Sequence, residues 1–231
     1  MEMIRSGIRY VDNNVNADKA DKALIASAQN KKVYDFLKRT GDIVFSAAGL
    51  IILLPLFLVI SAAVHMEDGG KVFFLQDRVG KNGRIFKMYK FRSMCADAEE
   101  KLAGLEHLNE ADGPVFKIEN DPRTTRVGRI IRRLSIDELP QLINCLKGDM
   151  SIVGPRPPLE REVSQYNDYQ LQRLLVKPGI TCYWQSCGRS AVSFDEWMDM
   201  DMKYIRERGV FTDIKILLMT VPAVLMRRGA C

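Results

Sequence analysis

The stretch IVFSAAGLIILLPLFLVISAAVHM, residues 43–66, decides the architecture of this chain. It contains no Asp, Glu, Lys or Arg, and its length satisfies the roughly 20 apolar residues that a helix needs to cross a bilayer. A secretory signal is disfavoured, because the run begins only at Ile43. A buried helix of a soluble domain is the alternative, but such helices seldom stay apolar on every face for this long. The stretch therefore predicts a membrane-associated helix.

Basic residues flank this stretch on both sides, and basic flanks tend to stay on the cytoplasmic side of a membrane. Because both ends carry the same bias, the charges favour no orientation for a single crossing. Pro55 lies at the middle, where it removes one backbone hydrogen bond and bends a helix. Two topologies stay open: a re-entrant helix broken at Pro55 that enters and leaves on one face, and a kinked span. The flanking cations are Lys31, Lys32, Lys38 and Arg39 before the stretch and Lys71, Arg78, Lys81, Arg84, Lys87 and Lys90 after it.

The composition of the whole chain is that of a folded protein. Of its 231 residues 47% are hydrophobic and the net charge is only +5, which excludes a disordered chain. The length is too short for two full catalytic domains. Five cysteines, an odd number, do not make a disulfide framework. With only two histidines in the chain, Cys182 and Cys187 are better explained as free thiols than as zinc ligands.

The chain divides into three regions: a polar N-terminal tail over 1–30, the membrane-associated segment over 31–68 and a compact domain over 69–231. In the domain, KVFFLQDRVG and IFKMYKFRSM flank the turn KNGR and predict a β-hairpin with Gly80 and Gly83 in its loop.

Helices are expected to dominate the rest of the domain, which gives a helix-dominated α+β fold. We predict helices over 96–108 and 194–208, the second with Met198, Met202 and Ile205 on a core-facing side. The apolar C-terminal segment over 212–231 is predicted to lie in the membrane interface or to pack on the domain.

Arginines gather in the segment RTTRVGRIIRRLSIDELPQL, residues 123–142. Arg126, Arg129 and Arg132 recur every three residues and share one face of a helix. Such a stripe can be an ordinary solvated surface, and this alternative stays open. The basic residues elsewhere favour phosphate binding, because rigidly mounted Arg suits bidentate contacts and Lys adds a point charge. These additional residues are Lys90 and Arg92 at the end of the hairpin and Arg156 in a Gly/Pro turn.

Two carboxylates, Asp137 and Glu138, follow the arginines. They could belong to a capping box that begins at Ser135, but Pro140 would then lose a helical hydrogen bond. We therefore predict Asp137 as the N-cap of a helix that Gly148 ends. A helix N-terminus favours an ionised carboxylate. A structural cap and a catalytic pair remain alternatives: in the second, Asp137 is a nucleophile on phosphorus and Glu138 a base or metal ligand.

At these residues the chain resembles the bacterial sugar transferase family, the monotopic phosphoglycosyl transferases. The resemblance extends from about residue 33 to the C-terminus. It rests on four ordered motifs: YKFRSM (89–94), the segment 123–142, GDMSIVGPRP (148–157) and KPGITCYWQSCGR (177–189).

This resemblance implies a ping-pong reaction in which Asp137 attacks a UDP-sugar to give a covalent phosphosugar and UMP. Polyprenyl (undecaprenyl) phosphate then attacks that intermediate, helped by Glu138, with Mg²⁺ near Asp137. This reaction begins exopolysaccharide, capsule, O-antigen or glycoprotein glycan assembly. By motif position, Lys90, Arg132 and Arg156 would hold phosphate groups, and Gln185 and Arg189 would lie on the nucleotide-sugar side.

The resemblance also implies a re-entrant helix broken at Pro55 in contact with membrane lipids. The catalytic domain would then lie on the cytoplasmic face of the bacterial inner membrane. We expect no nucleic-acid partner, because neither a groove-reading helix nor aromatic interleaving is evident. A membrane-tethered basic binding module and an inactive scaffold of the same fold are the rival hypotheses. A homo-oligomer, the particular UDP-sugar and the role of residues 1–30 are left open.

Overall fold

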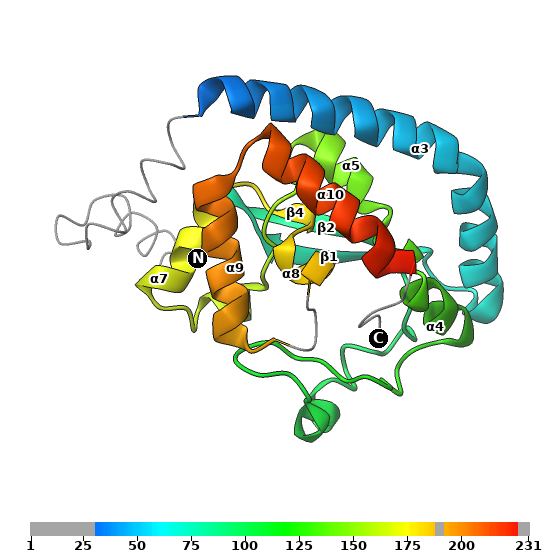
Figure 1. Cartoon of the computed structure of the whole chain (residues 1–231). Helices are drawn as coiled ribbons and strands as arrows, with labels where there is room; N and C mark the ends of the chain where they lie inside the picture. The colour runs from blue at the N-terminus through cyan, green and yellow to red at the C-terminus, as the bar shows by residue number, and fades with distance from the viewer. Residues whose placement is uncertain (1–30, 188–191, 226–231) are drawn as a thin grey trace.

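The computed structural model describes residues 31–187 and 192–225. Helices predominate, and the two β-sheets have two strands each, so the prediction of a helix-dominated α+β fold is confirmed. One long helix, α3 (Lys32–Asp68), runs along the top of the domain in Figure 1 and then turns down one side of it. The predicted tail over 1–30 lies outside the described residues.

Helix α3 is the only described helix that is long and apolar enough to cross a membrane. Only 6% of the most apolar 18-residue stretch of α3 is buried. The core helix of a soluble protein would be mostly buried. Its exposed side chains include Ile51, Ile52 and Leu58. Pro55 lies inside the helix, and Figure 1 shows α3 changing direction along its length so that its C-terminal part descends beside α4 (Arg126–Arg133). These features support membrane association.

Polar contacts fasten the inner face of α3 to the domain near both of its ends. Near its start, Arg39 donates to the carbonyls of Cys145 and Leu146 at the end of α5 (Gln141–Lys147), at 2.5 and 2.8 Å. At its far end, Glu67 accepts hydrogen bonds from the backbone N–H groups of Arg126 and Val127, at 2.7 and 3.2 Å. Glu67 thus satisfies two N–H groups that the first turn of α4 leaves without partners inside its own helix.

The predicted β-hairpin is confirmed. Strand β1 (Phe73–Val79) pairs antiparallel with β2 (Ile85–Phe91), with Phe73 opposite Phe91 and Val79 opposite Ile85. The turn between them contains the short 3-10 helix η1 (Lys81–Gly83). Asn144 of α5 joins this hairpin edge, because its side chain accepts from the Tyr89 N–H at 3.0 Å and donates to the Lys87 carbonyl at 2.8 Å.

A second sheet holds the Gly/Pro segment in place. Strand β3 (Ser151–Val153) pairs in parallel with β4 (Gly179–Thr181). A Cβ atom on Gly179 would lie only 2.1 Å from the backbone nitrogen of Gly154, so the two chains approach more closely than any side chain permits. This approach fixes the loop that carries Arg156.

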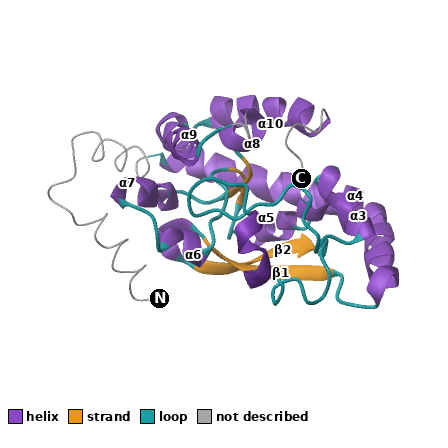
Figure 2. Cartoon of the chain, turned by 90° about the horizontal axis from the view of Figure 1, so that it is seen from below, coloured by secondary structure: helices purple, strands orange, loops and turns teal. Residues whose placement is uncertain are grey.

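Helix α9 (Phe194–Glu207) supplies much of the core, as predicted for the 194–208 segment. Met198, Met202 and Ile205 are all buried. Helix α10 (Val210–Leu225) packs on the domain through Ile216 and leaves apolar side chains such as Leu218 exposed on its other face. The remaining short helical segments are α6 (Glu160–Val163), α7 (Asp168–Leu171), η4 (Gln172–Leu175) and α8 (Tyr183–Cys187), seen in part in Figure 2.

The helix predicted over 96–108 is wrong for most of its length. The chain makes turns after Cys95 and only Ala103–Leu108 forms a helix, the 3-10 helix η2. Ala98 is its buried apolar residue, and Gly104 lies inside the segment. So small an apolar contact does not hold a regular helix, whose stability in proteins comes mainly from packing.

Candidate active site

The two carboxylates lie on a 3-10 turn, η3 (Ile136–Glu138), between α4 and α5. The prediction of Asp137 as a helix N-cap is wrong: Pro140 holds that position, and α5 begins at Gln141. Since Pro140 has no N–H to donate, the Ile136 carbonyl instead accepts from Leu139, at 3.1 Å. The prediction that Gly148 ends the helix is confirmed, because this residue has the left-handed conformation at the C-cap of α5.

Ser135 introduces this turn in a left-handed backbone conformation, with φ of 55°. A non-glycine residue rarely adopts this conformation, and strained residues of this kind cluster at functional sites. The side chain of Ser135 makes no capping hydrogen bond, so the capping-box alternative does not hold. Ser135 thus reverses the chain after α4 and directs the following carboxylate inward.

Asp137 is buried, with 8% of its surface exposed. Burial raises the pKa of its carboxyl to about 6; nearby Lys90 and Arg132 act in the opposite direction, and Glu138 adds to the rise. The raised pKa corrects the sequence prediction that a helix N-terminus favours ionisation of this carboxyl, because loss of solvent dominates. A group with this pKa is still about 90% ionised at pH 7, so Asp137 combines a charged carboxylate with a dry environment.

Cations from two elements lie near the turn. Lys90 of β2 forms an ion pair with Glu138, with 2.8 Å between Nζ and Oε1. Arg132 of α4 is held by Thr124, whose hydroxyl accepts from the guanidinium at 3.2 Å. The hairpin therefore contributes Lys90 to a group that the adjoining segments α4 and η3 complete with Arg132, Asp137 and Glu138.

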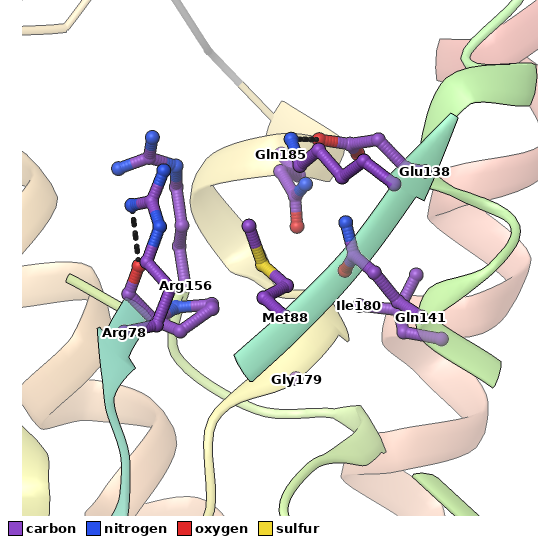
Figure 3. Close-up of a pocket in the computed structure, with 10 residues that line it drawn as sticks. Arg78, Met88, Glu138, Gln141, Arg156, Gly179, Ile180 and Gln185 are labelled. Carbon is purple, nitrogen blue, oxygen red and sulfur yellow. Dashed lines mark hydrogen bonds and ion pairs between the residues drawn. The ribbon is translucent and has the colours of Figure 1, made fainter. Parts of the chain in front are cut away.

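A pocket opens beside this turn (Figure 3). It brings together four of the residues that the sequence singled out, namely Lys90, Glu138, Arg156 and Gln185. In Figure 3, Arg78 and Arg156 lie together on one side and Glu138 and Gln141 on the other, with Gln185 and Met88 between them. The other lining residues are Pro157, Gly179 and Ile180.

Other predicted residues lie elsewhere. Arg92 forms an ion pair with Asp68 at the end of α3 and so fastens the membrane helix to the hairpin. Arg129 is exposed on α4. Arg189 falls outside the described residues.

Sequence reasoning missed Arg78 as a pocket residue and counted it only as a flanking charge. A usable signal was present, because Gln76 and Arg78 are two residues apart in a strand and therefore share one face. Two polar residues on the face of a strand that packs toward the domain indicate a polar site. The second missed residue, Gln141, is the first residue of α5 and is buried.

Within the described part of the chain, no three His, Cys, Asp or Glu side chains gather as a metal site. The donors near the pocket are the adjacent carboxylates of Asp137 and Glu138. This donor set suits Mg²⁺, which is commonly held by one or two carboxylates together with water and substrate phosphates.

A long, exposed apolar helix beside a buried carboxylate, a partly exposed one, arginines and a lysine is the arrangement expected of a membrane-associated protein that binds phosphate groups. The particular family follows from the family model for bacterial sugar transferases, which matches residues 33–227. The chain belongs to the bacterial sugar transferase family.

Several named proteins are similar to this chain in sequence. The galactosyl transferase CpsE of Streptococcus agalactiae is 49% identical over 84% of this chain and 43% of its own length. The exopolysaccharide production protein ExoY of Rhizobium meliloti is 41% identical over 84% of this chain and 87% of its own. An undecaprenyl-phosphate galactose phosphotransferase of Salmonella typhimurium is 44% identical over 87% of this chain and 43% of its own. The chain thus spans less than half of the first and third relatives and most of the second.

Proposed function

We propose that the chain transfers a sugar 1-phosphate from a UDP-sugar to undecaprenyl phosphate and releases UMP, as an early step of exopolysaccharide assembly. Family membership and the names of the relatives support this reaction. The observation that carries it is Asp137, a buried carboxylate between Lys90 and Arg132 beside a pocket and a membrane-associated helix.

In the first half-reaction an oxygen of Asp137 forms a bond to the sugar-bearing phosphorus of the UDP-sugar. The bond from that phosphorus to the bridging oxygen breaks, and UMP leaves with the electron pair. Burial leaves the Asp137 carboxylate poorly solvated, and a poorly solvated anion is a stronger nucleophile. Lys90 and Arg132 would offset the charge of the phosphates that approach it.

In the second half-reaction an oxygen of undecaprenyl phosphate attacks the phosphorus of the phosphosugar on Asp137. The bond to Asp137 breaks, and its carboxylate is regenerated. Glu138 lines the pocket and can receive the proton of a monoprotonated lipid phosphate. Its ion pair with Lys90 orients its carboxylate at the pocket wall.

Asp137 and Glu138 would hold Mg²⁺ together with the diphosphate of the donor. The ion would supply charge neutralisation for the diphosphate.

The proposed location is the bacterial inner membrane with the domain on its cytoplasmic face. There α3 would be re-entrant, although the expected break is not seen, because α3 stays helical through Pro55 and changes direction without interruption. Cysteines introduced singly at Ser6 and Lys81 test this topology in a variant whose five native cysteines are replaced by serine, because Cys187 is exposed and would react as well. With a membrane-impermeant maleimide, both should react from the same side. Reaction from opposite sides would show that α3 crosses the membrane.

The reaction is tested with the full chain in lipid nanodiscs, with labelled UDP-sugar, undecaprenyl phosphate and Mg²⁺. UDP-galactose and UDP-N-acetylgalactosamine are the first donors to test, because relatives carry these sugars in their names. Label should enter the organic phase with the wild-type chain and not with Asp137→Asn. Asp195→Asn, an exposed change on α9, is the matched control and should keep full activity.

A second measurement separates the covalent mechanism from direct transfer. Without lipid acceptor, the wild-type chain should release one UMP per active site and gain the mass of one sugar phosphate. Asp137→Asn should do neither. Transfer by a chain that never gains this mass would refute the covalent route but leave the overall reaction standing.

A further inference from the structure

Two guanidinium groups lie side by side in the wall of the pocket, those of Arg78 and Arg156 (Figure 3). Arg78 comes from β1 and is only 5% exposed. Its Nε and one terminal nitrogen donate to the side-chain oxygen of Gln76, at 3.0 and 2.6 Å. Its other terminal nitrogen donates to the Pro157 carbonyl at 2.9 Å. Arg78 is therefore held in a fixed orientation next to the loop that carries Arg156.

The charges of this pair are poorly neutralised. Among the described residues, no carboxylate oxygen lies within ion-pair distance of Arg78. The nearest carboxylate oxygen to Arg156 belongs to Glu162, at 3.9 Å, and the buried terminal nitrogen that faces it makes no hydrogen bond in the described structure. Glu162 is itself engaged, since it accepts from the Leu159 N–H at 2.9 Å. Burial and the repulsion by Arg156 lower the pKa of Arg78 to about 9.

A buried cation beside a partly buried one, without a full counter-charge, is costly to the fold, and an anion in the pocket would relieve that cost. A guanidinium has five N–H donors, and Arg78 uses three of them in its hydrogen bonds to Gln76 and Pro157. One N–H remains on each of its terminal nitrogens. Two such donors match two oxygens of a phosphate, and Arg156 adds further donors beside them.

The position of the pair within the pocket indicates which phosphate it binds. Figure 3 places Arg78 and Arg156 across the pocket from Glu138, the neighbour of Asp137 in the catalytic turn. In phosphoryl transfer the attacking and leaving oxygens are roughly in line, so the leaving group departs on the side away from the nucleophile. With Asp137 attacking from the side of the turn that carries Glu138, the arginine pair lies on the side of the leaving group.

We propose that Arg78, oriented by Gln76, acts with Arg156 to bind the nucleotide phosphate of the donor, the phosphate that departs as UMP. This inference rests on the proposed function and assigns Arg78 a binding role in it. One oxygen bridges the two phosphorus atoms of the donor. When its bond to the sugar-bearing phosphorus breaks, the electron pair stays on this oxygen, which leaves as part of the UMP phosphate. Arg78 and Arg156 neutralise the charge that develops there.

The test measures binding of UMP and of uridine to the full chain in nanodiscs by titration calorimetry. Arg78→Gln should weaken UMP binding by roughly 10- to 100-fold, the effect of losing charge-assisted hydrogen bonds, and leave uridine binding unchanged. Arg78→Lys keeps the positive charge but loses the paired N–H donors of the guanidinium, and should bind UMP with intermediate affinity. Arg84→Gln, an exposed change in the same hairpin, is the matched control and should bind UMP like the wild type.

Melting curves without ligand identify any variant that fails to fold. If Arg78→Gln does not fold, the UMP affinity of Arg78→Lys is compared with that of the wild type instead. Unchanged UMP affinity in a folded Arg78 variant would overturn the inference, as would an equal loss of UMP and uridine affinity. Loss of UDP-sugar binding with unchanged UMP affinity would also overturn it, since the pair would then hold the sugar-side phosphate. The transfer assay is separate: absence of turnover with Arg78-dependent UMP binding refutes the proposed function alone.

Discussion

Replacing Asp137 by Asn is expected to stabilise the folded chain at neutral pH although it abolishes transfer. The carboxyl is buried, and its pKa rises from 3.8 to about 6, mainly through loss of solvent. The folded state thus binds the proton more tightly than the unfolded chain does, so ionising Asp137 destabilises the fold. One pKa unit corresponds to about 1.4 kcal/mol, which puts the cost of ionisation at roughly 3 kcal/mol. Asparagine carries no charge and avoids this cost.

The sign of the pKa rise fixes the pH window of the effect. Below about pH 4 the carboxyl is protonated in both states, and Asp137 costs nothing by this mechanism. Between about pH 4 and 6 the unfolded chain loses its proton while the folded chain retains it, so the cost grows. Above pH 6 the cost is complete. The stability advantage of Asp137→Asn should follow this same window.

Melting temperatures of the two proteins in nanodiscs, measured at pH 4 and pH 8, test this reasoning. For a chain of this size, roughly 3 kcal/mol corresponds to an increase of about 6–12 °C at pH 8, with almost none at pH 4. Asp77→Asn is the control, because Asp77 is exposed and pairs with Lys87 on the hairpin surface. An Asp137→Asn advantage that is the same at both pH values, or a less stable variant at pH 8, would refute the reasoning.

Three further outcomes are expected. Transfer activity should fall about tenfold between pH 7 and pH 5 as Asp137 becomes protonated, and a flat pH–rate profile would contradict this. Asp213→Asn should destabilise the junction between α3 and α10 by about 1–3 kcal/mol, because Asp213 accepts from Lys38 at 2.6 Å; faster proteolysis near α3 would report the loss. Gly179→Ala should destabilise the fold by about 1–3 kcal/mol or more, because its Cβ would collide with the backbone of Gly154; an unchanged melting temperature would argue against this contact.

The features that sequence alone predicted correctly are those set by local pattern. The hairpin follows from alternating strands around a Gly-containing turn, and the end of α5 follows from Gly148. The core face of α9 follows from the helical spacing of Met198, Met202 and Ile205. Each of these signals is contained within a few neighbouring residues, where periodicity and turn chemistry are reliable guides.

The features that sequence missed depend on contacts between distant segments. Strands β3 and β4 have three residues each, too few for a periodic signal, and they pair only because Gly154 and Gly179 let two loops approach. Dipole arguments suggested an ionised Asp137, but the burial that raises its pKa is a tertiary property. Arg78 was counted as a flanking charge because only the assembled pocket places it beside Arg156.

The hydrogen bonds between Glu67 and the start of α4 require that α3 has a fixed number of residues between Pro55 and Glu67. Each residue of an α-helix turns the chain by about 100° and advances it by about 1.5 Å. One residue inserted between Pro55 and Glu67 would therefore rotate Glu67 away from the N–H groups of Arg126 and Val127. Because α4 leads directly into Ser135 and Asp137, the same insertion would release the segment that holds Asp137. Natural variants of this helix should accordingly tolerate changes of side chain beyond Pro55 far better than changes of length.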